Sequence, residues 1–323
     1  MNIIIFTEGG NDNGFGHISR CSALYDEIVL RGLNAKLIVN TDLERIEMLS
    51  NKEYEIADWL SLSYLERNSF DQTYCIIDSY IADIEVLEYI KLKSVNCMYI
   101  DDYNRLNYPK GITLTPALIK ESSVKNNENE LSGPDYIILR KEFTNKRERI
   151  INEDVKKVLV TLGGSDAKGL TEEIIKKVIP HFPLFSFDIV LGNGKSSPEL
   201  IDENRIENVN IINNASAYEM KELMIDSDFS ITAAGQTVYE LTATNTPFIP
   251  IKTAENQQNN INGLFDFNVI NCLIDSDDPF WIENLLFEIN RLKTYDSRLE
   301  FYHRSKGLID GRGCKRIVDR LLK

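Results

Sequence analysis

The first forty residues alternate between short apolar runs and a stretch in which apolar side chains recur at helical spacing. Residues 2–6 (NIIIF) form an apolar run that leads into a polar, Gly-rich segment. Helical spacing follows over residues 17–31, Gly32 ends it, and residues 35–40 (AKLIVN) form the next apolar run. This order predicts a strand, a helix and a second strand, and therefore a βαβ unit with parallel strands.

The alternation continues and restarts once. Strands are predicted at 75–80 and 96–101 with a helix at 84–93 between them, and the polar residues 120–135 predict an exposed loop. After a charged segment near residues 145–155 the pattern begins again. It predicts strands that run into Gly-rich turns over 158–166 and 187–194. It also predicts strands at 209–214, 229–235 and 247–251, and helices at 169–179, 217–225 and 237–244.

Two α/β domains follow from this restart. The length of 323 residues suits two domains of about 150 residues each. We expect an N-terminal domain over 1–148 and a C-terminal domain over 149–323, with a last helix at 312–322 that could cross back onto the first domain. Ligands of such sheets bind beyond the carboxyl ends of the strands. Two domains that face each other would form a cleft lined by these loops.

Composition narrows the class of protein. The hydrophobic fraction of 43% and the charged fraction of 27% are typical of a soluble globular protein. A net charge of −14 disfavours a nucleic-acid partner, because binding to a phosphate backbone needs clustered Lys and Arg. We see no signal peptide and no apolar run long enough for stable membrane insertion. Five scattered cysteines favour reduced thiols over disulfides or zinc, so we expect a cytoplasmic protein without a metal site.

The segment GFGHISRC at residues 14–21 holds one of three histidines. Gly14 and Gly16 would let a ligand approach the backbone, and a helix that begins here would attract an anion. His17 could exchange a proton near neutral pH. It could also make only a local hydrogen bond at the helix start. Arg20 lies one helical turn further on, where it could support a site or form an ordinary salt bridge.

A second Gly-rich loop, TLGGSD at residues 161–166, follows a predicted strand. Gly163 and Gly164 suit a phosphate or base site, or a simple tight turn, and Ser165 or Asp166 could cap the next helix. The loop lacks the dinucleotide fingerprint, so no nicotinamide cofactor is expected. The segment LGNGKSS at 191–197 lacks the spacing of a P-loop, which excludes a nucleoside triphosphatase of that type.

The segment from 233 to 260 carries the densest signal. Gly235, Gln236 and Thr237 end a strand and open a helix, which suits a diphosphate. Glu240, three residues past Thr237, could accept hydrogen bonds from both hydroxyls of a ribose. The alternative is a capping box, with Thr237 as the N-cap.

Amides and carboxylates mark further strand ends. Asn256 and Gln257 precede another helix, where they could bind sugar substituents or cap the helix. Tyr80 follows a strand that ends at Asp78, and it could reach into the site or pack half-buried. Asp101 and Asp102 end the next strand; neighbours on a strand point to opposite faces, which disfavours a joint metal site.

Together these motifs resemble one family, the nucleotide-sugar hydrolases of pseudaminic acid biosynthesis, which have the GT-B fold and are related to MurG-type N-acetylglucosaminyltransferases. The matching segments occur in order: GFGHISRC, IIDSYIAD, GPDYIILRKEF, VTLGGSD, AAGQTVYEL, AENQ and LIDGRGCKRIV. The resemblance implies two Rossmann-like parallel-sheet domains. It also implies hydrolysis of UDP-2,4-diacetamido-2,4,6-trideoxy-β-L-altropyranose, with inversion at the anomeric carbon.

The resemblance also implies residue roles. His17 would be the catalytic acid or base, and Tyr80 and Asn256 would act beside it at the sugar. The other residues would bind the UDP-sugar: Gly14, Gly16, Arg20, Gly163, Gly164, Ser165, Gly235, Gln236, Thr237, Glu240 and Gln257. No cofactor and no metal would be needed, since backbone N–H groups at helix N-termini can offset the diphosphate charge.

Two positions depart from the family pattern, and two other functions stay open. Phe15 stands where a small residue is common, and Gln236 where a second glycine is common. One alternative is a GT-B glycosyltransferase that moves the sugar to an acceptor hydroxyl. The other is a nucleotide-sugar binding module without catalysis, against which an intact His17 weighs.

Overall fold

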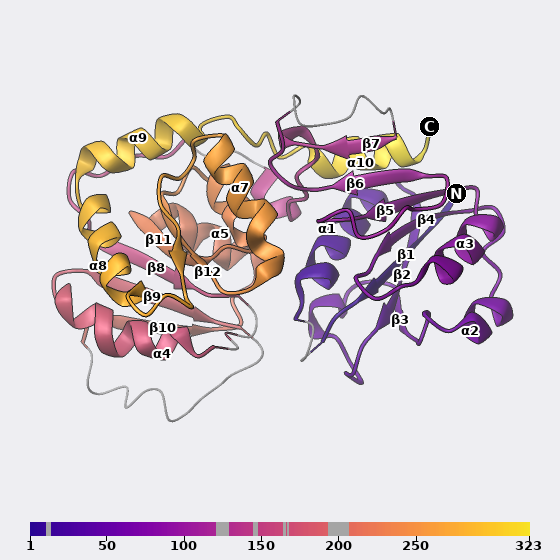
Figure 1. The fold of residues 1–323 in the computed structure, drawn as a ribbon, viewed down its shortest axis with the longest axis horizontal. Helices are drawn as coiled ribbons and strands as arrows, with labels where there is room; N and C mark the ends of the chain where they lie inside the picture. The colour runs from indigo at the N-terminus through magenta and orange to yellow at the C-terminus, as the bar shows by residue number, and fades with distance from the viewer. Residues whose placement is uncertain (11–13, 121–128, 145–147, 164–165, 167, 193–206) are drawn as a thin grey trace. The chain divides into compact units, whose positions relative to one another are not determined.

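The computed structural model describes residues 1–10, 14–120, 129–144, 148–163, 166, 168–192 and 207–323. The chain divides into two compact units, each with its own sheet (Figure 1). Unit 1 comprises Met1–Thr144 together with Asp310–Lys323, and unit 2 comprises Asn145–Ile309. The C-terminal residues therefore pack with the first half of the chain.

Unit 1 is built on a parallel sheet, which among the described residues has seven strands in the order β3-β2-β1-β4-β5-β6-β7. The strands are β1 (Asn2–Glu8), β2 (Asn34–Asn40), β3 (Tyr54–Ile56), β4 (Thr73–Asp78), β5 (Asn96–Ile100), β6 (Ile112–Thr115) and β7 (Glu130–Ser132). The helices are α1 (Gly16–Leu30), α2 (Leu62–Arg67), α3 (Ile84–Lys93) and α10 (Gly313–Leu321), with short 3-10 turns η1 (Glu47–Leu49), η3 (Pro134–Tyr136) and η4 (Lys141–Thr144).

Strand order in unit 1 places two loops side by side. β1 pairs in parallel with β2 on one side and with β4 on the other, in a register that aligns Asn2 with Asn34 and with Thr73. The strands after β1 are thus added first on the β2 side of β1 and then, from β4 onward, on its opposite side. At such a switch point the loops that follow the two central strands diverge and leave a crevice at the carboxyl ends. Here those loops follow β1 and β4.

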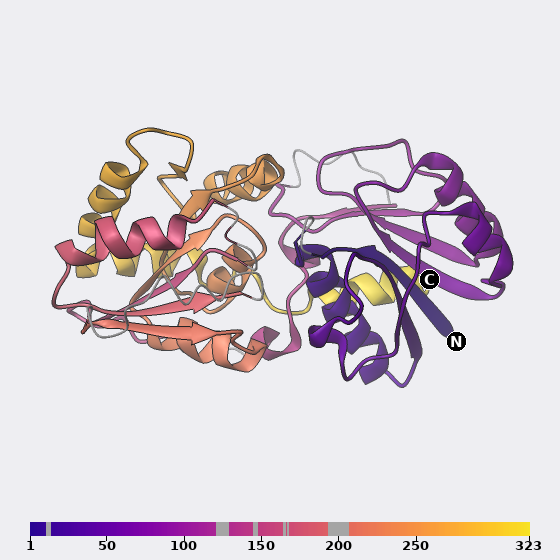
Figure 2. The ribbon, with the colours of Figure 1, turned by 90° about the horizontal axis from the view of Figure 1, so that it is seen from below.

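Both faces of this sheet are covered. Ile3 and Ile5 of β1 pack toward α1 and α10, whereas Phe6 packs on the opposite face with Trp59 and Phe70. This alternation reflects the two-residue period of a strand. On the first face α10 lies beside α1 (Figure 2), and it buries three aliphatic side chains completely: Ile317, Val318 and Leu321.

Unit 2 repeats the arrangement with a parallel sheet in the order β10-β9-β8-β11-β12-β13 within the described residues. Its strands are β8 (Lys157–Thr161), β9 (Ser186–Leu191), β10 (Val209–Asn213), β11 (Phe229–Ala233), β12 (Phe248–Lys252) and β13 (Ile274–Asp275). Its helices are α4 (Leu170–Glu173), the π-helical η5 (Ile174–Val178), η6 (Ile179–His181), α5 (Ala217–Asp226), α6 (Thr237–Ala243), η8 (Glu255–Gln257), α7 (Gln258–Asp266), α8 (Trp281–Leu292) and α9 (Tyr295–Ser305). The switch point lies between β8 and β11.

Two sequence predictions need correction. The loop expected over 120–135 contains the edge strand β7, whose Leu131 is buried in the core of unit 1. A strand of three residues with one apolar side chain carries no readable alternation. The single helix expected over 169–179 is divided into α4, η5 and η6, with Pro180 inside the last turn. The strands and helices in the remaining βα pattern form close to the predicted bounds, which confirms the α/β class with parallel sheets.

Candidate active site

The Gly-rich loop after β1 directs His17 into unit 1. The backbone N–H of Gly10 donates to the carbonyl of Gly14 at 3.0 Å, which closes the loop just before α1 begins at Gly16. Gly14 has a φ of +69°, a left-handed conformation that favours glycine. A Cβ at Gly9 would lie 2.7 Å from the carbonyl oxygen of Gly14, so the close approach of these two segments also requires glycine. His17 is consequently the second residue of α1 and is 7% exposed.

Asp78 is the direct partner of His17. It is the last residue of β4 and is fully buried, and its Oδ1 lies 2.6 Å from Nδ1 of His17. The two residues are 61 positions apart in the chain. The β1–β4 switch point brings them together, because α1 starts from the loop after β1 and Asp78 ends the neighbouring strand.

Arg20 holds the same carboxylate from the next turn of α1. Its Nε donates to Oδ2 of Asp78 at 2.7 Å and one terminal nitrogen donates to Oδ1 at 2.6 Å, a bidentate pair. The other terminal nitrogen donates to Oδ1 of Asp102 at 2.8 Å. Arg20 therefore both supports the site and forms salt bridges, so the two roles left open by the sequence coincide.

The carboxylate of Asp78 orients the ring of His17. Burial alone would raise the pKa of Asp78. The Arg20 guanidinium and His17 together outweigh burial and hold this pKa well below its usual range. An ionised carboxylate only accepts hydrogen bonds, so the short contact assigns the ring proton to Nδ1. With the proton on Nδ1, a neutral ring would carry its lone pair on Nε2, which is the state a general base requires.

Asp102 and Tyr80 extend this network. Asp102 follows β5, and its Oδ2 accepts a hydrogen bond of 2.5 Å from the hydroxyl of Tyr80. The rings of Tyr80 and His17 meet edge to face, with centroids 4.2 Å apart and planes at 84°. Asp101 instead accepts from backbone N–H groups of its own loop, at Tyr103 and Arg105. The two neighbouring carboxylates thus serve different partners.

Among the described residues no group of three or more His, Cys, Asp or Glu could hold a metal ion.

Three of the predicted residues, His17, Arg20 and Tyr80, therefore lie in one network. The sequence marked Asp78 and Asp102 only as strand ends. Their roles become visible once the strand order makes β4 the neighbour of β1 and β5 the neighbour of β4.

In unit 2 the loop after β8 contains the second glycine motif. Gly163 is exposed with a φ of +89°, and a Cβ there would meet nothing within 4 Å. Asp166 accepts from the backbone N–H groups of Leu170 and Thr171 at 2.9 and 3.0 Å, so it caps α4, one of the options the sequence left open. Gly164, Ser165 and residues 193–197 of the LGNGKSS segment lie outside the described residues.

The loop after β11 contradicts the capping-box alternative for Glu240. Helix α6 begins at Thr237 and its N-cap is Gln236, which makes no side-chain capping hydrogen bond. Thr237 is therefore not the N-cap, and Glu240 lies buried on the helix. A Cβ at Gly235 would meet nothing within 4 Å, and the buried Oε1 of Gln236 has no hydrogen-bond partner within the described parts of the chain.

The two amides predicted in the loop after β12 have different surroundings. Gln257 accepts from the backbone N–H of Thr253 at 2.8 Å and donates to its hydroxyl at 2.9 Å, so its side chain stabilises its own loop. Asn256 is exposed in η8. Nearby, Asn260 of α7 donates to the carbonyl of Ala234 and accepts from the hydroxyl of Tyr239. Helix α7 is thereby tied to the loop after β11 and to α6.

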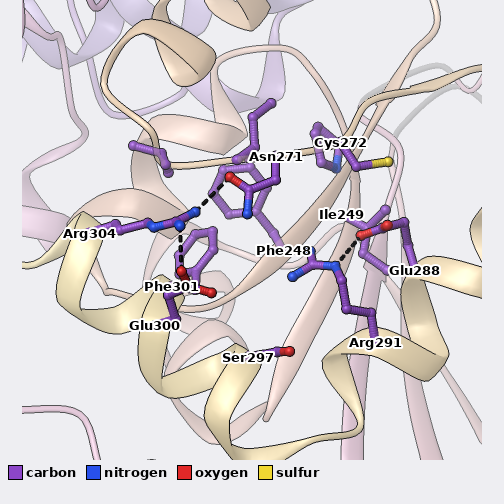
Figure 3. A pocket seen from close by; sticks show the side chains of 13 residues that line it. Phe248, Ile249, Asn271, Cys272, Glu288, Arg291, Ser297, Glu300, Phe301 and Arg304 are labelled. Carbon is purple, nitrogen blue, oxygen red and sulfur yellow. Dashed lines mark hydrogen bonds and ion pairs between the residues drawn. The ribbon is translucent and has the colours of Figure 1, made fainter.

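A small pocket in unit 2 lies away from this edge. It opens beside the first residues of β12, between α8 and α9 (Figure 3). Arg304 donates to Asn271 at 2.6 Å and Arg291 donates to Glu288 at 2.7 Å across its wall. None of the predicted site residues lines this pocket, and its place at the amino end of a strand is not where ligands of parallel sheets bind.

Three curated proteins are similar in sequence to the chain. The spore coat polysaccharide biosynthesis protein SpsG of Bacillus subtilis is 24% identical over 98% of the chain and 97% of its own length. A Helicobacter pylori protein named pseudaminic acid cytidylyltransferase and UDP-2,4-diacetamido-2,4,6-trideoxy-β-L-altropyranose hydrolase is 27% identical over 76% of the chain. An uncharacterized protein of Methanocaldococcus jannaschii is 25% identical over 80% of it. The matches span 43% of the H. pylori protein and 57% of the M. jannaschii protein. No family model matches the chain.

Solved structures show the fold. MurG of Acinetobacter baumannii superposes with a TM-score of 0.65 at 13% identity, over 100% of this chain and 99% of that one. The Streptomyces glycosyltransferase SsfS6 gives 0.61 at 8% over 99% of both chains, and Staphylococcus aureus MnaA with UDP gives 0.62 at 13% over 99% and 96%. The chain therefore has the GT-B fold, as the motifs predicted. No helix among the described residues is long and apolar enough to cross a bilayer.

Proposed function

We propose that the chain is a nucleotide-sugar hydrolase that cleaves a UDP-linked 2,4-diacetamido-2,4,6-trideoxy sugar at the anomeric carbon with inversion. It would release UDP and the free sugar for the synthesis of pseudaminic acid or a related nonulosonic acid. The observation that carries the proposal is the buried His17–Asp78 pair, which leaves Nε2 of His17 available as a base. The hydrolase activity in the name of the H. pylori relative and the spore coat polysaccharide biosynthesis in the name of SpsG support the substrate class.

His17 would activate water in this reaction. One O–H bond of the water breaks as its oxygen bonds to C1, the proton passes to Nε2, and the electron pair of the C1–O bond leaves with the diphosphate. The resulting imidazolium lies against Asp78, whose negative charge stabilises it. Arg20 keeps Asp78 ionised and fixed in position.

Unit 2 would bind the nucleotide. Backbone N–H groups of Gly235, Gln236 and Thr237 would contact the diphosphate, and the open space at Gly235 permits that approach. Glu240 would accept from the ribose hydroxyls. Asn256, exposed in η8, would reach the sugar or its phosphates, whereas Gln257 would act by holding that loop through Thr253.

Further glycines would complete both loops in this proposal. Gly14 and Gly16 would allow the substrate to approach the start of α1, and Gly163, Gly164 and Ser165 would contribute to the nucleotide side. The exposed, open position of Gly163 is compatible with that role.

A glycosyltransferase is the second candidate, because MurG and SsfS6 share the fold and SsfS6 is named a glycosyltransferase. In that case an acceptor hydroxyl would replace water at His17. Glycosyl transfer requires an acceptor, whereas hydrolysis does not, so an assay without an acceptor distinguishes the two reactions.

Proton and phosphorus NMR of purified protein with UDP-2,4-diacetamido-2,4,6-trideoxy-β-L-altropyranose and no acceptor tests the proposal. Free reducing sugar appearing together with UDP supports hydrolysis, and the first anomer formed reports inversion. Substrate that binds without turnover supports the transferase instead.

The His17→Gln variant should lower kcat by about 10²–10⁴-fold, the range for loss of a general base. His303→Gln, at an exposed histidine of α9, is the matched control and should leave kcat unchanged. Near-normal turnover of His17→Gln would exclude the proposed role of His17.

A further inference from the structure

Asp102 is shared between a cation and a phenol at the candidate active site. Its Oδ1 accepts from Arg20 at 2.8 Å, and its Oδ2 lies 2.8 Å from the second terminal nitrogen of Arg20. The same Oδ2 accepts the hydroxyl proton of Tyr80 at 2.5 Å. The Asp102 side chain is only 13% exposed, so water competes little for these contacts.

The hydroxyl proton of Tyr80 is therefore directed at Asp102. Burial and the neighbouring Asp102 carboxylate raise the pKa of Tyr80 far above its usual range, so the phenol stays protonated. Its single O–H bond is used by Asp102, and the phenolic oxygen retains lone pairs that can only accept.

The backbone of Tyr80 is fixed as firmly as its hydroxyl. Its N–H donates to Oε1 of Glu8 at 2.7 Å, and Ser79 donates to Oε2 of the same buried carboxylate at 2.5 Å. The Ser79 hydroxyl in turn accepts from the N–H groups of Ile81 and Ala82. Tyr80 is thus held at both ends, with its ring edge to face with that of His17.

We propose that Asp102 is a positioning residue that keeps the Tyr80 oxygen a hydrogen-bond acceptor, so that the site selects a sugar with an N–H or O–H donor beside the bond that is cleaved. This inference rests on the proposed hydrolase function and adds a determinant of its specificity. An acetamido N–H of the proposed substrate is a donor of the required kind. The acceptors at Nε2 of His17 and the oxygen of Tyr80 would then bind water and sugar, respectively.

Unit 1 contains a matched control for this arrangement. Glu55 of β3 likewise lies between a cation and a phenol, since it accepts from Lys36 at 2.7 Å and from the hydroxyl of Tyr64 at 2.9 Å. This second triad includes none of the residues of the His17 network. Tyr64→Phe and Glu55→Ala therefore remove the same kinds of hydrogen bond elsewhere in the same unit.

The test is a double-mutant cycle on the full chain with UDP-2,4-diacetamido-2,4,6-trideoxy-β-L-altropyranose as substrate. Tyr80→Phe and Asp102→Ala should each lower kcat/KM by about tenfold, the value of one hydrogen bond to substrate, and leave the Kd of UDP unchanged. The double variant should be no slower than the single variants, because Asp102 acts through Tyr80. Tyr64→Phe and Glu55→Ala should change kcat/KM less than about twofold, since their triad does not meet the substrate.

Other outcomes overturn the inference in distinguishable ways. One such outcome is that the losses in kcat/KM of the two single variants multiply in the double variant; another is that Tyr80→Phe keeps full activity. Either would mean that Asp102 acts through Arg20 and not through Tyr80. If wild-type protein binds the sugar nucleotide without turnover, the proposed hydrolysis fails. The double-mutant cycle is then measured by calorimetry, as the Kd of the sugar nucleotide relative to the Kd of UDP for each variant. Absence of any binding by wild-type protein would overturn the proposed function and this inference together.

Discussion

At the scale of single residues, Asp78 accounts for most of the organisation of the candidate site. It is fully buried, yet it is ionised because Arg20 and His17 compensate for the loss of water. A carboxylate whose pKa is lower in the folded than in the unfolded chain stabilises the fold at pH values above its unfolded pKa, about 3.9. That stabilisation disappears as the pH falls from there toward the folded pKa.

Asp78→Asn should therefore change the pH dependence of stability. At pH 6 we expect the free energy of unfolding to fall by about 3 kcal/mol, because the substitution leaves the Arg20 side of a buried ion pair without its partner. The difference from wild type should shrink between about pH 4 and pH 2. Urea unfolding across this range measures it, with the exposed Asp58→Asn as control. A difference that stays constant down to pH 2 would contradict the assignment of an ionised, ion-paired Asp78.

The same residues mark what sequence reasoning reaches and what it does not. His17 and Arg20 lie one turn apart on one helix, so their common site follows from local spacing. Their carboxylate partners lie 58 and 82 positions from Arg20, and only the order of the strands brings them near. Which strand neighbours β1 depends on packing of both sheet faces, which a local pattern of apolar residues does not encode.

At the scale of elements, Gly313 permits α10 to lie against η3. A Cβ built on Gly313 would come within 1.9 Å of the carbonyl oxygen of Ile137, a backbone atom that cannot rotate away. Gly16 also opens a helix, α1, but a Cβ there would meet nothing within 4 Å. The two glycines thus share a helical position and differ in their surroundings.

Gly313→Ala should lower the free energy of unfolding by about 1–3 kcal/mol, because the added methyl group forces α10 away from Ile137. Gly16→Ala should lower it by no more than about 0.5 kcal/mol. Thermal and urea unfolding of the two variants provide the comparison. Equal effects would show that the contact between α10 and η3 contributes little to the fold.

Elements with a regular pattern were predictable, and irregular ones were not. The strands β1, β4 and β8 contain continuous apolar runs, as expected for strands buried on both faces. β7 has three residues, and η5 departs from the helical period by a wider turn. Neither leaves a periodic signal long enough to distinguish it from a loop or an ordinary helix.

At the scale of the whole molecule, the chain crosses from unit 1 to unit 2 and returns. Two similar sheets were predictable because the strand–helix alternation restarts after residue 150. The packing of the last helix, expected over 312–322, on the first domain was suggested only as a possibility, because the amphipathic pattern of a helix does not say which part of the protein its apolar face contacts. In the structure α10 completes the core beside α1, where Ile317, Val318 and Leu321 are fully buried.

This packing predicts a stability effect confined to one unit. Val318→Asp places a charge in the core of unit 1, and we expect a loss of about 3 kcal/mol or more from the lost aliphatic burial and the unpaired carboxylate. Lys315→Asp puts the same side chain on the exposed face of α10 and should lower the free energy of unfolding by less than about 0.5 kcal/mol.

Hydrogen exchange followed by mass spectrometry measures where the effect lies. Val318→Asp should show faster exchange in α1 and β5, because both contact α10, and unchanged protection in β8 and β11. Equal deprotection of both sheets would mean that the two units unfold as one cooperative structure, and unchanged protection of α1 would mean that α10 is dispensable for the core of unit 1.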